Sequence, residues 1–131
     1  MGTPEYMKFP LVEYEGRCEN VRKLMEKENL KGLFITEGTN FNYFSGGTRR
    51  TDYSRPTFMF LPLEGDPIVL VHKFPEKNRR REIWVEDIRI YQTLQGTPFD
   101  MVVEAMKDVR LNEGRVGAEL GFEQRLGISF N

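Results

Sequence analysis

Residues 57–71 read TFMFLPLEGDPIVLV, in which two apolar runs flank a short turn. Residues 57–61 and 68–71 are mainly aromatic, β-branched and other apolar residues, a composition that favours strands. Pro62 and the Glu-Gly-Asp-Pro turn at residues 64–67 separate the two runs. This pattern predicts a β-hairpin made of two strands that are neighbours in a sheet.

The segment before the hairpin predicts a helix and then a strand. Between residues 12 and 29 the apolar residues recur at helical spacing, while most charged residues lie off that stripe. The stripe consists of Tyr14, Cys18, Val21, Leu24 and Met25. Asn29, followed by Lys31 and Gly32, is a helix stop signal, and residues 33–35 are then typical of a strand buried on both faces.

The segment after the hairpin predicts more strand and a second helix. Residues 83–85 and 88–91 have strand character, either as two short strands or as one bent strand. Thr97 is the expected helix cap, with Pro98 in the first helical position and Asp100 in the first turn. The apolar face of this helix is expected to comprise Phe99, Val102, Val103 and Met106.

The last part of the chain predicts one more strand. Gly114 is expected to end the second helix, and residues 115–120 then have the alternation of a strand. The resulting order is helix, strand, hairpin, strand, helix, strand. This order predicts a layered α/β domain built around a mixed sheet.

Length and charge limit the class of protein. At 131 residues the chain is long enough for one domain, which we place at residues 13–131 behind a flexible tail of residues 1–12. Nineteen basic and twenty acidic residues leave a net charge of -1, so no global field attracts nucleic acid or an anionic membrane. Cys18 is the single cysteine, and no apolar run reaches the roughly 18 residues of a membrane span. We therefore expect a cytoplasmic protein with no nucleic-acid or membrane partner.

The sequence offers few residues for catalysis at neutral pH. His72 is the single histidine, and the chain lacks an HExxH motif, paired cysteines, a phosphate-binding glycine loop and a Gly-x-Ser-x-Gly elbow. Phe34 occupies the centre of the first strand, where a two-metal nuclease with a ribonuclease H-like sheet needs a carboxylate. We therefore predict no catalytic residue, no metal site and no cofactor in this chain.

Several residues have both a structural and a functional interpretation, and we favour the structural one. His72 is expected to be a strand-end residue rather than a ligand-binding one, and Cys18 a small buried thiol rather than a reactive one. Trp84 is expected to pack in the core or an interface. The basic residues expected on a solvated face rather than on phosphate are Lys77, Arg79, Arg80 and Arg81.

Residues 40–56, NFNYFSGGTRRTDYSRP, differ from an ordinary connector. Glycines allow sharp turns, tyrosines provide flat contact area, and arginines bind carboxylates through two parallel hydrogen bonds. One interpretation is a recognition loop in which residues 40–46 pack and residues 49–55 bind. The alternative is a structural turn in which Tyr43 and Phe44 fill the core and the arginines are merely solvated.

Several motifs occur in a characteristic order along residues 14–120. They are Arg17 on the first helix, GLFIT at residues 32–36, NFNYFSG at residues 40–46, Arg55-Pro56 before TFMFLP, the Gly-Asp-Pro turn, and RVGAE at residues 115–119. This series resembles the N-terminal domain of the creatinase/prolidase family, the pita-bread metallopeptidases. NFNYFSG is similar to the family's Asn-Ile-x-Tyr-Leu/Tyr-Thr/Ser-Gly signature, and RVGAE to its Lys/Arg-Ile/Val-Gly-x-Glu element.

The resemblance implies a three-layer α/β/α domain with a mixed sheet of about five to six strands and a ribonuclease H-like motif. It also implies that the chain is the non-catalytic part of a Xaa-Pro aminopeptidase, dipeptidase or creatinase-like hydrolase. The catalytic domain would follow residue 131, and its aspartates, histidine and glutamates would hold a divalent metal, Mn, Zn or Co. The chain alone would then be inactive.

In this family the N-terminal domain drives dimer formation and sends a loop over the active site of the partner subunit. The resemblance makes Tyr53, Arg55, Arg49 and Arg50 candidates for binding a peptide or small carboxylate substrate there. Residues 47–52 depart from the commoner family pattern, so no substrate is assigned. The alternative is a stand-alone α/β binding module for a small carboxylate or a protein partner. Nucleic-acid binding through residues 77–81 and the arginine-containing residues 49–55 is a third hypothesis, which the net charge disfavours.

Overall fold

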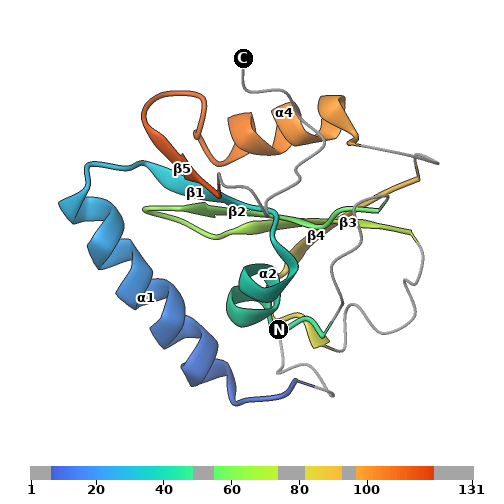
Figure 1. Ribbon diagram of the computed structural model, residues 1–131, viewed down its shortest axis with the longest axis horizontal. Helices are drawn as coiled ribbons and strands as arrows, with labels where there is room; N and C mark the ends of the chain where they lie inside the picture. The colour runs from blue at the N-terminus through green and yellow to red at the C-terminus, as the bar shows by residue number, and fades with distance from the viewer. Residues whose placement is uncertain (1–6, 49–54, 74–81, 93–96, 120–131) are drawn as a thin grey trace.

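The computed structural model describes residues 7–48, 55–73, 82–92 and 97–119. Within them a five-stranded sheet lies between helices on its two faces (Figure 1). The strands are β1 (Gly32–Ile35), β2 (Phe58–Pro62), β3 (Ile68–His72), β4 (Asp87–Tyr91) and β5 (Val116–Ala118). Helices α1 (Leu11–Lys27) and α2 (Gly38–Ser45) cover one face and α4 (Phe99–Asp108) the other, which confirms the expected three-layer α/β/α architecture. None of the helices in these ranges is long and apolar enough to cross a membrane.

The sheet is mixed, with the strand order β4-β3-β2-β1-β5. Strand β2 pairs antiparallel with both β3 and β1, whereas β1 with β5 and β3 with β4 are parallel pairs. The hairpin expected at residues 57–71 is therefore confirmed. Pro62, which we expected between its two strands, is instead the last residue of β2 and pairs with Gly32. Proline keeps its carbonyl acceptor, and Pro62 O accepts a hydrogen bond from Arg22 Nε at 3.0 Å.

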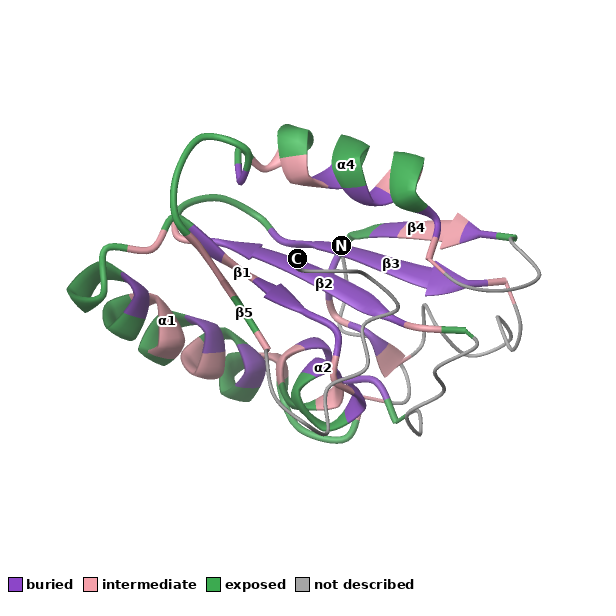
Figure 2. Ribbon diagram, turned by 45° about the horizontal axis from the view of Figure 1, so that its top comes forward, coloured by how far each residue is buried: buried purple, intermediate pink, exposed green. Residues whose placement is uncertain are grey.

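Successive residues of β2 and β3 face opposite sides of the sheet, and both sides are buried. The side chains on the α1 and α2 side are Met59, Leu61, Val69 and Val71, and those on the α4 side are Phe58, Phe60, Ile68 and Leu70. Burial on both faces explains why these strands are continuous apolar runs rather than alternating ones (Figure 2).

Helix α1 ends at a left-handed residue, as the stop signal predicts. Asn29 has a φ of 58°, and its N–H donates to Glu26 O at 3.1 Å. Leu30 N donates to Met25 O at 2.8 Å, which completes a Schellman motif and satisfies carbonyls at the helix end. Leu24, which we expected on the buried stripe, is 61% exposed. It lies about 100° around the helix from the buried Met25, away from the sheet.

Helix α4 ends at Asp108, so the expectation that Gly114 ends it was wrong. The stop is Arg110, which has a φ of 60°. Leu111 N donates to Met106 O at 2.7 Å, and the helix therefore closes with a second Schellman motif. The left-handed position is held by an arginine, which is not a recognised stop signal, and for this reason the pattern pointed to the later glycine.

The start and the apolar face of α4 also differ from expectation. The helix begins at Phe99, with Pro98 in the N-cap position that we assigned to Thr97. Val102 is buried, but Phe99 is 53% exposed and Val103 is 48% exposed. Val102 faces the sheet, and Val103 is turned about 100° away from it by the helical repeat.

Residues 83–85 and 115–119 form less strand than their sequences suggest. The structure contains neither alternative for residues 83–91: strand β4 covers Asp87–Tyr91, and residues 83–85 are not part of a strand. Ile83 and Val85, each 1% exposed, pack into the core on the α1 side without strand pairing. Within residues 115–119, strand β5 comprises Val116–Ala118.

Helix α2 includes residues 40–45, the first six residues of the segment that we treated as a loop. The Glu37 side chain accepts a hydrogen bond from Asn40 N at 3.0 Å and so caps the helix start. Gly46 follows the last turn with a φ of 88°. Phe41, with 0% exposure, is the aromatic residue that fills the core, whereas Tyr43 is 49% exposed. Of the two residues that the structural alternative placed in the core, Phe44 is half-buried and packs against it, whereas the expectation for Tyr43 was wrong.

Candidate functional site

The carboxyl ends of four strands lie side by side at one end of the sheet, where the strands stop. Strands β1, β3, β4 and β5 run in the same direction and β2 in the opposite one, so their carboxyl ends lie together beside the start of β2. We call this the carboxyl edge; its residues are Thr36, Glu37, Arg55, Pro56, His72, Tyr91 and Glu119. In open α/β sheets this edge is the usual place for a binding site.

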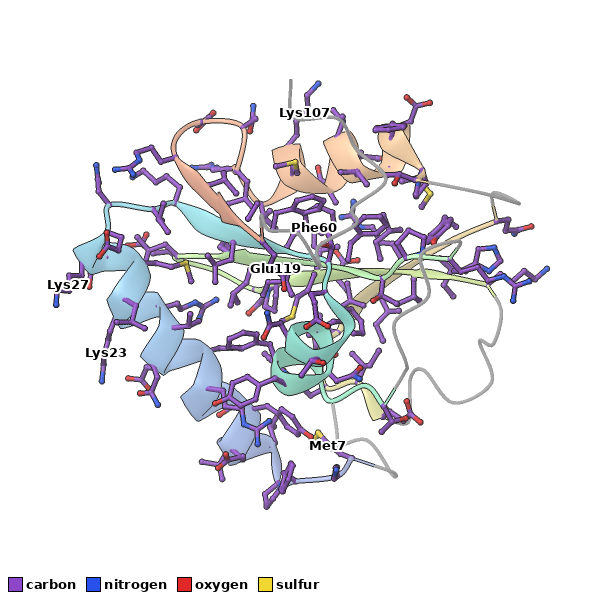
Figure 3. The ribbon with its side chains drawn as sticks, in the orientation of Figure 1. Met7, Lys23, Lys27, Phe60, Lys107 and Glu119 are labelled. Carbon is purple, nitrogen blue, oxygen red and sulfur yellow. The ribbon has the colours of Figure 1, made fainter. Side chains whose placement is uncertain are left out.

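Glu119 ties three elements together at the carboxyl edge. It follows β5, whose parallel pairing with β1 brings it to the end of β1. Its Oε1 accepts from Thr36 N at 2.5 Å and from Glu37 N at 2.9 Å. Its Oε2 accepts from Asn40 Nδ2 at 2.7 Å. Figure 3 shows Glu119 between the sheet and the start of α2, where a negative charge is favourable.

The other end of α2 is held by Trp84. Its indole Nε1 donates to Phe44 O at 2.7 Å, and its backbone N donates to Ser45 O at 3.2 Å. Gly46 is required here, because a Cβ at this position would lie 2.7 Å from Glu82 O. Trp84 also packs against the core on the α1 side, which confirms its expected packing role.

Arg17 joins α1 to α2 on the outer side of the molecule. Its Nη1 donates to Tyr43 O at 2.8 Å, and its Nε pairs with Glu13 at 3.1 Å. The guanidinium carbon lies 4.2 Å from the centre of the Tyr43 ring and 5.0 Å from that of Tyr14. Sequence reasoning connected Arg17 with the family motif but missed this role, which depends on a helix that it did not predict.

Tyr91 and His72 form the part of the edge next to Arg55. The Tyr91 hydroxyl donates to Pro56 O at 2.6 Å. The His72 ring stands edge-on to the Tyr91 ring, with centroids 5.0 Å apart. His72 is 5% exposed at the end of β3, as its structural interpretation predicts, whereas Arg55 is exposed.

Of the four predicted substrate-binding residues, the structure places only Arg55. Arg49, Arg50 and Tyr53 lie outside the described residues, as does the basic run at residues 77–81. Their proposed roles therefore stay predictions. In the ranges that the structure describes, no three His, Cys, Asp or Glu residues are grouped so that they could hold a metal ion.

Cys18 is buried and protonated. It is 2% exposed in the core between α1 and the sheet. Burial raises the pKa of its thiol from 9.0 to about 11, against a smaller lowering by the nearby Arg22 charge. A thiol in this state is a poor nucleophile at neutral pH, so the expectation of an inert buried cysteine is confirmed.

Two cavities lie at the opposite edge of the sheet. One, of about 470 Å³, is lined by residues that include Pro67, Trp84 and Asp87. The other, of about 550 Å³, is lined by residues that include Pro62 and Glu64. Neither of these two cavities is lined by residues of the carboxyl edge.

The fold has counterparts among proteins of known structure. The dipeptidase PepE of Mycobacterium ulcerans is 25% identical with a TM-score of 0.60, over 76% of this chain and 27% of that one. A dipeptidase of Pyrococcus horikoshii is 20% identical with a TM-score of 0.66, over 83% of this chain and 29% of that one. This chain thus spans less than a third of the length of these two proteins.

This chain matches almost the whole length of a solved structure of the isolated Creatinase/Prolidase N-terminal domain of an X-Pro dipeptidase from Streptococcus pyogenes. It matches with a TM-score of 0.59 and 13% identity, over 79% of this chain and 99% of that one. Among curated proteins no significant sequence match was found. The sequence profile of the Creatinase/Prolidase N-terminal domain matches residues 17–130. The chain therefore belongs to the Creatinase/Prolidase N-terminal domain family.

Proposed function

We propose that this chain is the non-catalytic N-terminal domain of a metal-dependent Xaa-Pro peptidase. In this proposal a separate catalytic domain breaks the bond, and the domain described here mediates formation of a homodimer. It also contributes residues at its carboxyl edge to the substrate site of the partner subunit. The family match over residues 17–130 and the fold shared with dipeptidases support the proposal.

The observation that carries the proposal is the position of Arg55. It is exposed at the carboxyl edge, next to the buried start of β2. A guanidinium recognises a carboxylate through two parallel charge-assisted hydrogen bonds, and a Xaa-Pro dipeptide ends in a carboxylate. We propose that Arg55 binds this carboxylate, with Arg49, Arg50 and Tyr53 as further contacts.

The metal of such a peptidase would not be bound here. We propose that the divalent ion, Mn, Zn or Co, is held by the catalytic domain, as the resemblance to the family implies. The role of this chain is then to bind and orient, and binding energy from a remote contact can contribute to the rate.

The test compares the 131-residue chain with the enzyme that contains it, using alanyl-proline as substrate and added Mn²⁺ or Zn²⁺. The chain alone should not hydrolyse the dipeptide, whereas the enzyme should. In the enzyme, Arg55→Ala should lower kcat/KM by the equivalent of about 2–3 kcal/mol, because a charge-assisted contact is lost. Lys107→Ala removes the same charge from the exposed side of α4 and should change nothing (Figure 3).

Other results would assign a different function. Hydrolysis by the 131-residue chain alone would show that this domain is itself catalytic. Unchanged kinetics of the Arg55→Ala enzyme would remove Arg55 from the substrate site. Saturable binding of acetyl-proline by the chain, without any associated hydrolase activity, would favour the stand-alone binding module.

A further inference from the structure

We infer that Tyr91 is a positioning residue for Arg55, because its hydroxyl holds the backbone from which the arginine side chain projects. This inference rests on the proposed function, in which Arg55 binds the carboxylate of the substrate. Tyr91 itself does not touch the substrate in this scheme. It acts through the carbonyl of Pro56.

The donor is rigid. Tyr91 is the last residue of β4 and pairs with His72 of β3, and its carbonyl accepts from Lys73 N at 2.9 Å. The ring is 2% exposed, with the ring centroid of His72 at 5.0 Å and that of Phe58 at 6.4 Å. A side chain packed in this way has little rotamer freedom, so its hydroxyl stays at one place on the edge of the sheet.

The backbone around the acceptor, Pro56 O, is conformationally restricted as well. Pro56 has a fixed φ, and the residue before a proline is confined to extended conformations, which limits Arg55. The Tyr91 hydroxyl then fixes Pro56 O at 2.6 Å, and the chain enters the buried strand β2 two residues later. Few backbone torsions are left that could move Arg55 relative to the sheet.

A fixed backbone under an exposed charged side chain is a form of preorganisation. The guanidinium remains free to meet a ligand, while the main chain need not be ordered when the ligand binds, so the entropic cost of binding is smaller. Loss of the Tyr91 hydroxyl should therefore weaken substrate binding more than it slows the chemical step.

The experiment is a double-mutant cycle in the enzyme, with alanyl-proline as the probe and KM and kcat measured separately. Tyr91→Phe removes one hydroxyl and should raise KM about three- to tenfold, the equivalent of one lost hydrogen bond, with kcat changed less than twofold. In an Arg55→Ala background the same substitution should have no further effect on KM, because Tyr91 acts through Arg55. Tyr43→Phe removes an exposed hydroxyl elsewhere and should leave KM unchanged.

The outcomes separate the two proposals. If Arg55→Ala leaves both KM and kcat unchanged, Arg55 does not bind the substrate, and this part of the proposed function is wrong. If Arg55→Ala raises KM but Tyr91→Phe does not, or if the two effects multiply, Tyr91 does not position Arg55 and the proposed function stands. Should Tyr91→Phe lower the thermal midpoint strongly, Pro56→Ala serves instead. It keeps the carbonyl but frees Arg55, and it should raise KM in the same way.

Discussion

The Glu119 carboxylate shows how a single residue can define the geometry of an edge. It accepts hydrogen bonds from the two residues that follow β1 and from Asn40 in the first turn of α2, although it lies 79 to 83 positions further along the chain. Backbone N–H groups at the end of a strand and the start of a helix would otherwise need water. The role of the glutamate in RVGAE is therefore structural.

Cys18 makes stability depend on pH in the alkaline range. Its pKa is raised by burial from 9.0 to about 11, so between these values the folded state keeps a proton that the unfolded state loses. The stabilisation is complete below pH 9 and is lost as the pH rises towards 11, by about 2–3 kcal/mol in total. Cys18→Ala should show a shallower decline over this interval. Urea unfolding of both proteins at pH 8 and pH 10.5 measures the difference, and equal declines would contradict it.

At the scale of elements, the ends of α1 and α4 share one design. Both close with a Schellman motif whose left-handed residue is not glycine, Asn29 in one and Arg110 in the other. Asparagine tolerates this conformation better than most residues, whereas for arginine the Cβ contact with the backbone carries a cost. The same motif is therefore more strained after α4 than after α1.

This difference predicts unequal effects of glycine. Arg110→Gly should raise the free energy of unfolding by about 0.5–1 kcal/mol, because strain at a φ of 60° is relieved. Asn29→Gly should change it by less, since asparagine accepts a φ of 58° more readily. Chemical denaturation of the two variants beside the parent chain tests this. A larger gain at Asn29 than at Arg110 would show that strain does not determine the effect.

At the scale of the whole molecule, the layers could be predicted because their signals are local. The apolar runs of β2 and β3 and the stripe of α1 are visible within short windows of sequence. Helix α2 was missed because its eight residues, Gly38–Ser45, are too few for a clear periodicity and include a glycine and two asparagines.

The candidate site was only partly predictable. Arg55 could be proposed from its residue type, but the contact of Tyr91 with Pro56 depends on the parallel pairing of β3 and β4.

The orientation of α4 decides which apolar residues belong to the third layer, and two adjacent valines test it. Val102 lies in the core between α4 and the sheet with 5% exposure, whereas Val103 is 48% exposed. Val102→Ala should cost about 1–3 kcal/mol of unfolding free energy because it leaves a cavity. Val103→Ala should change it by less than about 0.5 kcal/mol or even raise it, since alanine has the higher helix propensity. Both replacements have the same intrinsic effect on the helix, so the difference between them measures burial alone. Equal losses in thermal or urea denaturation would mean that both valines face the sheet, as the sequence pattern suggested, and that α4 packs on the sheet in a different rotation.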